Sequence, residues 1–255
     1  MSPILKHYHE TMLSEAVKGR RIAFFGGSFD PPHLGHLAVA RAAGAALALD
    51  RVLFAPVGAQ PLKPHGSTAP FADRLAMTQL AIAGDPAFAI SLADAPIAVG
   101  KPNFTLDTLR SLRTQLPPGG ELFCLMGADS FISLRKWHRG SEIPFAASLI
   151  VASRPGQLLD DLTAALPDGI TLSVAPQHSA TAPTQRDGPI EVHSYVLRNP
   201  AGDKAQFYLL PGLHVEISAS AIRDQVRSAS DIQPAGQDLL PPAVAEYIRL
   251  HGLYR

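Results

Sequence analysis

The chain has little cysteine or tryptophan and no net charge: its 255 residues include one of each, and 22 basic residues balance 22 acidic ones. One cysteine cannot form an internal disulfide, so the composition indicates a reducing, cytoplasmic environment. The balanced charge gives no support for attraction to nucleic acid or to a membrane surface. Residues 1–19 lack the long apolar core of a secretory signal or a membrane span. The expected partners are therefore small molecules.

Two common nucleotide-binding patterns are also absent, the Gly-x-Gly-x-x-Gly fingerprint and the Walker P-loop. In their place, an apolar strand pattern ends at Gly26 and Gly27, and a helical pattern follows with His33 and His36 near its start. Glycine lets an anion approach the main chain, and a helix N-terminus presents unpaired N–H groups. Because the two histidines are three residues apart, their rings point the same way and can donate to one phosphoryl group. The pattern predicts a phosphate site.

The two histidines could also have a different role. They could form half of a metal site, or they could cap the helix beside the turn. A zinc site needs further His, Cys or carboxylate ligands nearby, and Asp30 is the one clear candidate. The adjacent glycines favour phosphate, and we expect no metal site built from protein ligands.

A second helix start lies near residue 218. Ser218 occupies the position of an N-cap before a run compatible with a helix. Arg223, on that helix, can reach back toward an anion at its N-terminus with a fork of donors that stays charged. Taken by itself, an arginine at this position is expected to form a surface ion pair with Asp224 or Glu216.

A third feature is the apolar strand that covers residues 122 to 126, which contains Cys124 and is followed by Gly127 and Asp129. The sheets of α/β proteins bind ligands beyond the carboxyl ends of their strands. We therefore expect Asp129 both to accept from a ribose hydroxyl and to cap the next helix. Cys124 is expected to pack as a small apolar side chain.

The segment GGSFDPPHLGH resembles the HxGH signature of the nucleotidyltransferase superfamily, and ISASAIR at 217–223 resembles its ISxTxIR signature, with Ser220 replacing threonine. The resemblance implies transfer of a nucleotide from a triphosphate to a phosphate acceptor. Lys63 matches a loop where the family has a basic residue, although it could equally be a solvated loop lysine. The resemblance implies catalysis by His33, His36 and Arg223, and ATP or phosphate contacts at Gly26, Gly27, Ser28, Phe29, Lys63, Gly127, Asp129 and Ser218.

Three central segments, KPNFTLDTL, MGADS and KWH, resemble the nicotinate-nucleotide adenylyltransferases. In that family, backbone amides at the helix start that matches Phe104 and Thr105 bind the nicotinate carboxylate, and the residue that matches Trp137 stacks on the pyridine ring. A helix N-terminus favours a carboxylate, and an electron-poor ring stacks well on indole. Trp137 could instead anchor its loop.

The resemblance implies AMP transfer from ATP, with Mg²⁺, to nicotinic acid mononucleotide. Three alternatives remain: another phosphate acceptor such as nicotinamide mononucleotide or a phosphopantetheine, a nucleotide sensor without activity, and a metal-dependent hydrolase that uses the two histidines.

Strand patterns alternate with helical ones, which predicts an α/β, Rossmann-like fold with a mostly parallel sheet and helices on both faces. We expect an N-terminal extension at 1–19 with a short amphipathic helix, and one domain at 20–255 with an inserted surface hairpin at about 176–204. The expected strands are 21–25, 51–55, 88–92, 121–126, 148–152, 170–174, 190–197 and 205–210. The expected helices are 34–48, 71–83, 104–115, 129–135, 219–228 and 241–251.

Overall fold

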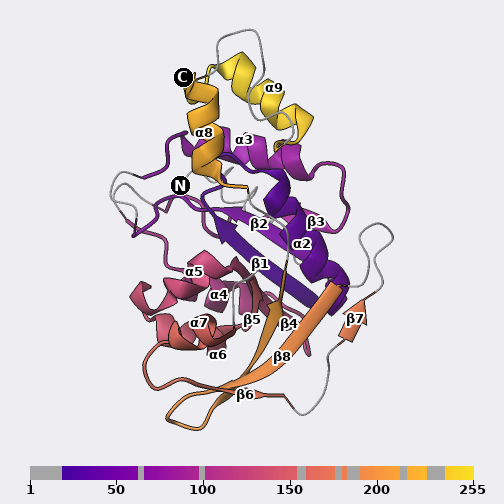
Figure 1. Cartoon of the computed structure of the whole chain (residues 1–255), viewed down its shortest axis with the longest axis vertical. Helices are drawn as coiled ribbons and strands as arrows, with labels where there is room; N and C mark the ends of the chain where they lie inside the picture. Colours follow the sequence, from indigo (N-terminus) through magenta and orange to yellow (C-terminus); the bar gives the residue numbers. More distant parts are fainter. Residues whose placement is uncertain are drawn as a thin grey trace.

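A central, mostly parallel sheet organises the chain (Figure 1). The computed structural model describes residues 19–62, 66–97, 101–153, 159–175, 180–182, 190–212, 217–228 and 239–255. The strand order is β3-β2-β1-β4-β5-β9-β8-β6, and β7 pairs with β8 outside this path. The strands are β1 (Arg21–Gly27), β2 (Arg51–Pro56), β3 (Phe88–Ile90), β4 (Glu121–Gly127), β5 (Ser148–Ala152), β6 (Thr171–Val174), β7 (Ala180–Ala182), β8 (Ile190–Arg198) and β9 (Lys204–Leu210).

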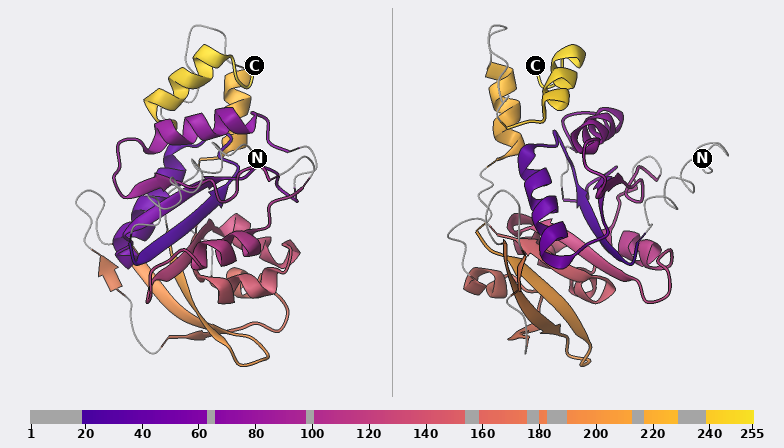
Figure 2. Two further views of the ribbon diagram at one scale, coloured as in Figure 1. Left: turned by 180° about the vertical axis from the view of Figure 1, so that it is seen from behind. Right: turned by 90° about the vertical axis from the view of Figure 1, so that its right-hand side faces the viewer.

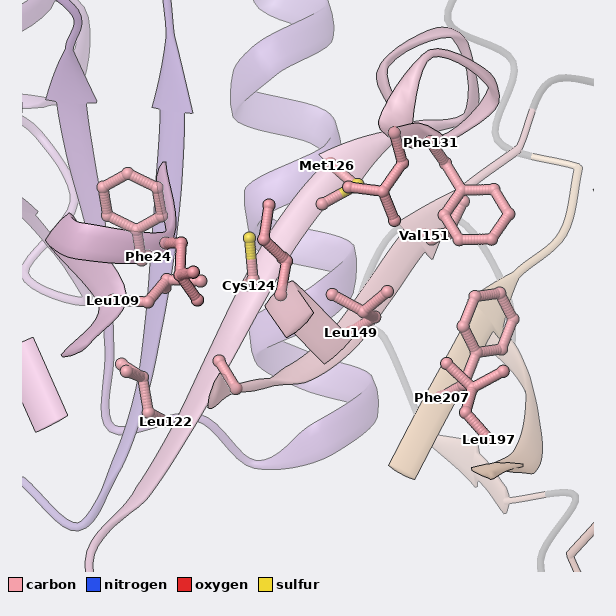
Figure 3. Packing of buried hydrophobic residues seen from close by; sticks show 14 of the residues in the cluster. Phe24, Leu109, Leu122, Cys124, Met126, Phe131, Leu149, Val151, Leu197 and Phe207 are labelled. Carbon is pink, nitrogen blue, oxygen red and sulfur yellow. The ribbon is translucent and has the colours of Figure 1, made fainter. Parts of the chain in front are cut away.

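Helices pack on both faces of the sheet. Side chains alternate along a strand, so Phe24 and Phe25 of β1 belong to two different core clusters. The first cluster, part of which is shown in Figure 3, lies under α4 to α7, and the second lies under α2 and α3. The helices are α2 (Leu34–Leu47), α3 (Phe71–Ile82), α4 (Thr105–Arg113), α5 (Ala128–Ile132), α6 (Ile143–Ala146), α7 (Leu159–Ala164), α8 (Ala219–Ser228) and α9 (Pro242–His251).

A third, smaller cluster joins α8 and α9 to α3. Figure 2 shows these three helices at the same end of the molecule. The two helices α8 and α9 therefore pack on α3 rather than on the sheet. None of the described helices is both long enough and apolar enough to cross a membrane.

The Rossmann-like α/β fold predicted from the sequence is confirmed. All of the predicted strands and helices occur, and their ends either agree with the prediction or differ from it by one to three residues. The predicted helix 129–135 is divided, because α5 ends at Ile132 and a separate 3₁₀ turn covers Leu134–Lys136. The sequence patterns did not predict the 3₁₀ turn Gly140–Glu142, the helices α6 and α7, or the strand β7.

The predicted strand, turn and strand at 190–210 are present as β8 and β9, which pair antiparallel. Both strands belong to the main sheet, because β9 also pairs in parallel with β5. The N-terminal extension falls almost wholly outside the described residues, as do 176–179 and 183–189. The division into an extension, one domain and an inserted hairpin stays a prediction.

Candidate active site

A cavity of about 860 Å³ opens at the carboxyl ends of β1 and β4. These two strands are neighbours in the sheet, and the chain leaves them in opposite directions along it, which makes this edge the switch point where α/β folds bind ligands. Lys63 lies outside the described residues. Every other site residue predicted from the sequence lines the cavity: Gly26, Gly27, Ser28, Phe29, His33, His36, Phe104, Thr105, Gly127, Asp129, Trp137, Ser218 and Arg223.

The turn after β1 is shaped by close packing. A Cβ atom on Gly26 would lie 2.7 Å from Phe24 Cζ, so any larger residue there would force the buried Phe24 ring to shift. Phe29 has a backbone φ of 46°, a value that residues other than glycine rarely adopt. Its ring is buried and meets the Phe25 ring edge-on at 5.6 Å between centroids. The Phe29 ring is therefore part of the core, and its main chain is the part that could meet a phosphate.

The two histidines stack on each other, with ring centroids 3.7 Å apart and planes inclined by 27°. The backbone N–H of His33 donates to Nδ1 of His36 at 3.1 Å. A neutral His36 must then carry its proton on Nε2, which makes Nε2 a hydrogen-bond donor.

Both imidazoles are held in the neutral form. Burial lowers the pKa of His33 to about 4, and burial together with the neighbouring His33 lowers the pKa of His36 well below its usual value. The Nδ1 atom of His33 is buried and has no hydrogen-bond partner within the described part of the chain. A ligand that enters the cavity could satisfy it.

Arg223 points at the turn after β1. One guanidinium nitrogen donates to the main-chain oxygen of Asp30 at 2.7 Å, and the other donates to Ser220 Oγ at 3.1 Å. Asp224 pairs instead with Arg227 at 2.8 Å. The expected alternative of an ion pair between Arg223 and Asp224 is therefore wrong, and Glu216 lies outside the described residues. Ser218 precedes α8 as expected, with Oγ 3.5 Å from the N–H of Ala221.

The start of α4 and the loop after α5 also line the cavity. Among the described residues no side chain caps α4, so its N-terminus is open toward the cavity. Trp137 is half-buried, and its indole N–H donates to Ser133 Oγ at 3.0 Å, which ties it to its own loop. His138 stacks on Phe104 with centroids 4.2 Å apart. His138 was not predicted as a site residue, although it directly follows Trp137.

A buried carboxyl group also faces the cavity. Asp94 is 4% exposed, and it accepts a short hydrogen bond from Thr108 Oγ of α4. Burial raises its pKa to about 6. No sequence pattern points to this residue, because Asp94 lies in an irregular loop and its partner is 14 residues away.

The prediction that Asp129 caps the helix after β4 is wrong. β4 extends to Gly127, which is itself the N-cap, so Asp129 lies inside the first turn of α5. Its side chain is exposed at the rim of the cavity. There a carboxylate can still reach a ribose hydroxyl.

A metal centre receives no support from the part of the chain that the structure describes. No three His, Cys, Asp or Glu side chains come together there in a way that could hold a metal ion. The two histidines instead face a cavity that also contains Arg223, a combination suited to an anion.

Several known proteins are similar to this chain in sequence or in fold. The cytidylyltransferase-like family model matches residues 24–225. The probable nicotinate-nucleotide adenylyltransferases of Trichlorobacter lovleyi and Geobacter metallireducens are each 36% identical over 92% of this chain, and the match covers 99% and 98% of those proteins. The solved structure of Plasmodium falciparum nicotinic acid mononucleotide adenylyltransferase complexed with NaAD shares the fold, with a TM-score of 0.64 and 18% identity over 92% of this chain and 98% of that one. The chain therefore belongs to the cytidylyltransferase-like family, in the group of the nicotinate-nucleotide adenylyltransferases.

Proposed function

We propose that this protein transfers AMP from ATP to nicotinic acid mononucleotide, giving nicotinic acid adenine dinucleotide and pyrophosphate, a step of NAD biosynthesis. One observation carries the proposal: a single cavity holds a cluster of phosphate donors at one end and an open helix start beside an indole ring at the other. The names of the relatives specify the same reaction. The roles given below to individual residues are part of the proposal.

The reaction is a direct in-line attack by the 5′-phosphate of the acceptor on the α-phosphorus of ATP. A phosphate oxygen forms the new P–O bond, and the bond to the β-phosphate oxygen breaks, which releases pyrophosphate. Because the acceptor is already an anion at pH 7, no general base is needed. The protein aligns the two anions and stabilises the charge that builds on the α-phosphoryl oxygens.

His36 and Arg223 supply that stabilisation. The Nε2–H of His36 is a preorganised neutral donor, since its Nδ1 is already occupied by the His33 N–H. Arg223 adds a permanent positive charge from α8. The Nδ1 atom of His33, which no described residue satisfies, gives the site one further hydrogen-bonding atom.

We also propose that Mg²⁺ binds together with ATP. Mg²⁺ prefers oxygen ligands in octahedral geometry, keeps several waters and usually binds through substrate phosphates. The bound ion would neutralise part of the charge on the phosphates. Chelation with EDTA should stop turnover, and added Mg²⁺ should restore it.

The start of α4, where the acceptor is proposed to bind, favours nicotinic acid mononucleotide over nicotinamide mononucleotide. The uncapped N-terminus of α4 presents backbone N–H groups beside Thr105, and such a site stabilises a carboxylate by about 0.3 to 1 kcal/mol when exposed. In this proposal Trp137, which lines the same cavity, stacks on the pyridine ring. Nicotinamide mononucleotide lacks the negative charge and gains less from the helix N-terminus.

Pyrophosphate release from ATP and Mg²⁺ tests the proposal. The assay compares nicotinic acid mononucleotide, nicotinamide mononucleotide and no acceptor. Release that strongly favours the acid supports both the reaction and the substrate, and equal release with the amide contradicts the selectivity at α4. Release without any acceptor would indicate a hydrolase, and no release with either acceptor would contradict the function.

We further propose a cytoplasmic location. Cys124 is buried, and burial raises the pKa of its thiol to about 12, so it stays protonated and unreactive as an apolar core residue. The balanced charge favours small-molecule partners over nucleic acid or membranes. Equal recovery of the protein from membrane and soluble fractions of a cell lysate would contradict this proposal.

A further inference from the structure

Asp30 lies at the centre of a buried hydrogen-bond network behind the phosphate end of the cavity. Its side chain is 4% exposed, and its carboxylate accepts from the N–H of Thr68 at 2.6 Å, from the N–H of Ala69 at 3.1 Å and from the hydroxyl of Tyr254 at 2.8 Å. The main-chain oxygen of the same residue accepts from Arg223. One residue therefore connects Tyr254, behind the site, to Arg223, inside it.

Tyr254 reaches Asp30 from a distant part of the chain. It follows α9, and its ring packs with Met77 of α3 and Ile222 of α8 in the third core cluster. The residue is 6% exposed and has a φ of 67°. Burial, the carboxylate and their hydrogen bond raise the pKa of Tyr254. The phenol is therefore a protonated donor at neutral pH.

Arg74 stabilises the same turn after β1 through hydrogen bonds that do not involve Tyr254. It is 2% exposed, and it donates to the main-chain oxygens of Ser28 at 2.7 Å, Val57 at 2.8 Å and Ala69 at 3.2 Å. Those bonds fix the backbone on either side of Asp30. The link from Tyr254 differs, because it ends on the residue whose carbonyl holds Arg223.

We propose that Tyr254 is a positioning residue for the transfer reaction: its hydroxyl fixes Asp30, and the Asp30 carbonyl then holds the Arg223 guanidinium in the orientation that meets the α-phosphate. This inference rests on the proposed function. Tyr254 touches no substrate, since it does not line the cavity.

The expected consequence is a loss of turnover rather than of binding. Without the phenol hydroxyl, Asp30 Oδ1 keeps the longer bond from Ala69, and the carbonyl that holds Arg223 is less firmly placed. A donor that acts on charge developing in the transition state affects kcat more than KM. Misplacement by about 1 Å can cost up to about 10²-fold in rate.

Tyr254→Phe and Tyr247→Phe form a matched pair. The hydroxyl of Tyr247, on α9, donates to Asp73 Oδ1 of α3 at 2.9 Å, so each variant removes one tyrosine-to-aspartate bond from the same end of the molecule. Of the two tyrosines, Tyr254 is the one that bonds to the turn of the active site. We expect Tyr254→Phe to lower kcat about tenfold, with KM for nicotinic acid mononucleotide unchanged within about threefold. For Tyr247→Phe we expect kcat within about twofold of the original.

A double-mutant cycle then separates positioning from a general structural effect. In an Arg223→Ala background, Tyr254→Phe should lower kcat less than about twofold further, because the side chain that it positions is gone. A second full tenfold loss would overturn the inference. A Tyr254→Phe enzyme as active as Tyr247→Phe would also overturn it.

Thermal unfolding of each variant identifies any loss of the fold. If Tyr254→Phe unfolds below the assay temperature, turnover and the cycle with Arg223→Ala are measured for all variants at a temperature below its unfolding midpoint, with the same expected result. The two proposals fail differently. An original protein that releases no pyrophosphate with any acceptor contradicts the proposed function, whereas an active original protein with no coupling between Tyr254 and Arg223 contradicts only this inference.

Discussion

His36 should contribute through the donor on Nε2 and not merely through its presence in the turn. The structure separates these two roles, because Nδ1 accepts the N–H of His33, whereas Nε2–H is not used in that bond and His36 lines the cavity. His36→Asn can keep a side-chain oxygen near the Nδ1 position while removing the outer donor. Removing one preorganised donor costs about 2.7 to 4 kcal/mol of transition-state stabilisation, or about 10² to 10³ in kcat. We therefore expect that loss in His36→Asn, even though the turn keeps its hydrogen bond.

Steady-state pyrophosphate release and thermal unfolding measure the two roles separately. His36→Gln serves as the matched control, because its amide can donate from near the Nε2 position, and we expect it to regain about tenfold over His36→Asn. Both variants should unfold within a few degrees of the original protein. Turnover of His36→Asn within about threefold of the original would refute the reasoning, because the donor on Nε2 would then have no effect on the reaction.

Three further predictions concern the walls of the site. Burial raises the pKa of Asp94 from 3.8 to about 6, so the cost of its charge to the folded state builds up as the pH rises from 3.8 to about 6 and is constant above that range. Asp94→Asn should therefore raise the free energy of unfolding by up to about 3 kcal/mol at pH 8 and leave it almost unchanged at about pH 3, measured by urea denaturation; an equal change at both pH values would contradict this. Gly140→Ala would place a Cβ atom 2.1 Å from Leu134 O, so the loop that carries Trp137 must shift, and KM for nicotinic acid mononucleotide should rise several-fold while KM for ATP stays the same. Arg74→Leu leaves three main-chain oxygens without their donor and should lower the free energy of unfolding by at least about 3 kcal/mol, seen as a lower urea midpoint; a loss below about 1 kcal/mol would show that water or a rearranged side chain replaces it.

The fold was predictable where the pattern is local. The alternation in β1 and the glycines after it place the start of α2 within one residue, and the runs for β4 and β5 are equally clear. Strand direction at the far edge was not predictable in this way. β8 and β6 run antiparallel to their neighbours, and only pairing between distant segments decides that. The short helix α7 was missed, because six residues are too few to show a helical period.

The same distinction between local and distant features applies to the candidate site. Motifs identified which side chains line the cavity, since glycine turns, paired histidines and helix starts are local features. The contacts that orient those side chains were not visible in the sequence. Asp94 meets Thr108 of α4 across an irregular loop, and Tyr254 is 224 residues from Asp30. Spacing along the chain carries no information about such pairs.

The two groups proposed to stabilise the α-phosphate are therefore held by constraints of different kinds. His36 owes its donor to a bond within one helical turn, so any chain that forms this turn with these two histidines obtains the same tautomer. Arg223 owes its direction to a carbonyl 193 residues away, so its placement depends on the packing of α8 in the third core cluster. Substitutions that loosen the packing of α8 should then lower kcat through Arg223, while His36 keeps its bond to the N–H of His33. In such variants we expect kcat to fall by no more than the loss caused by Arg223→Ala itself.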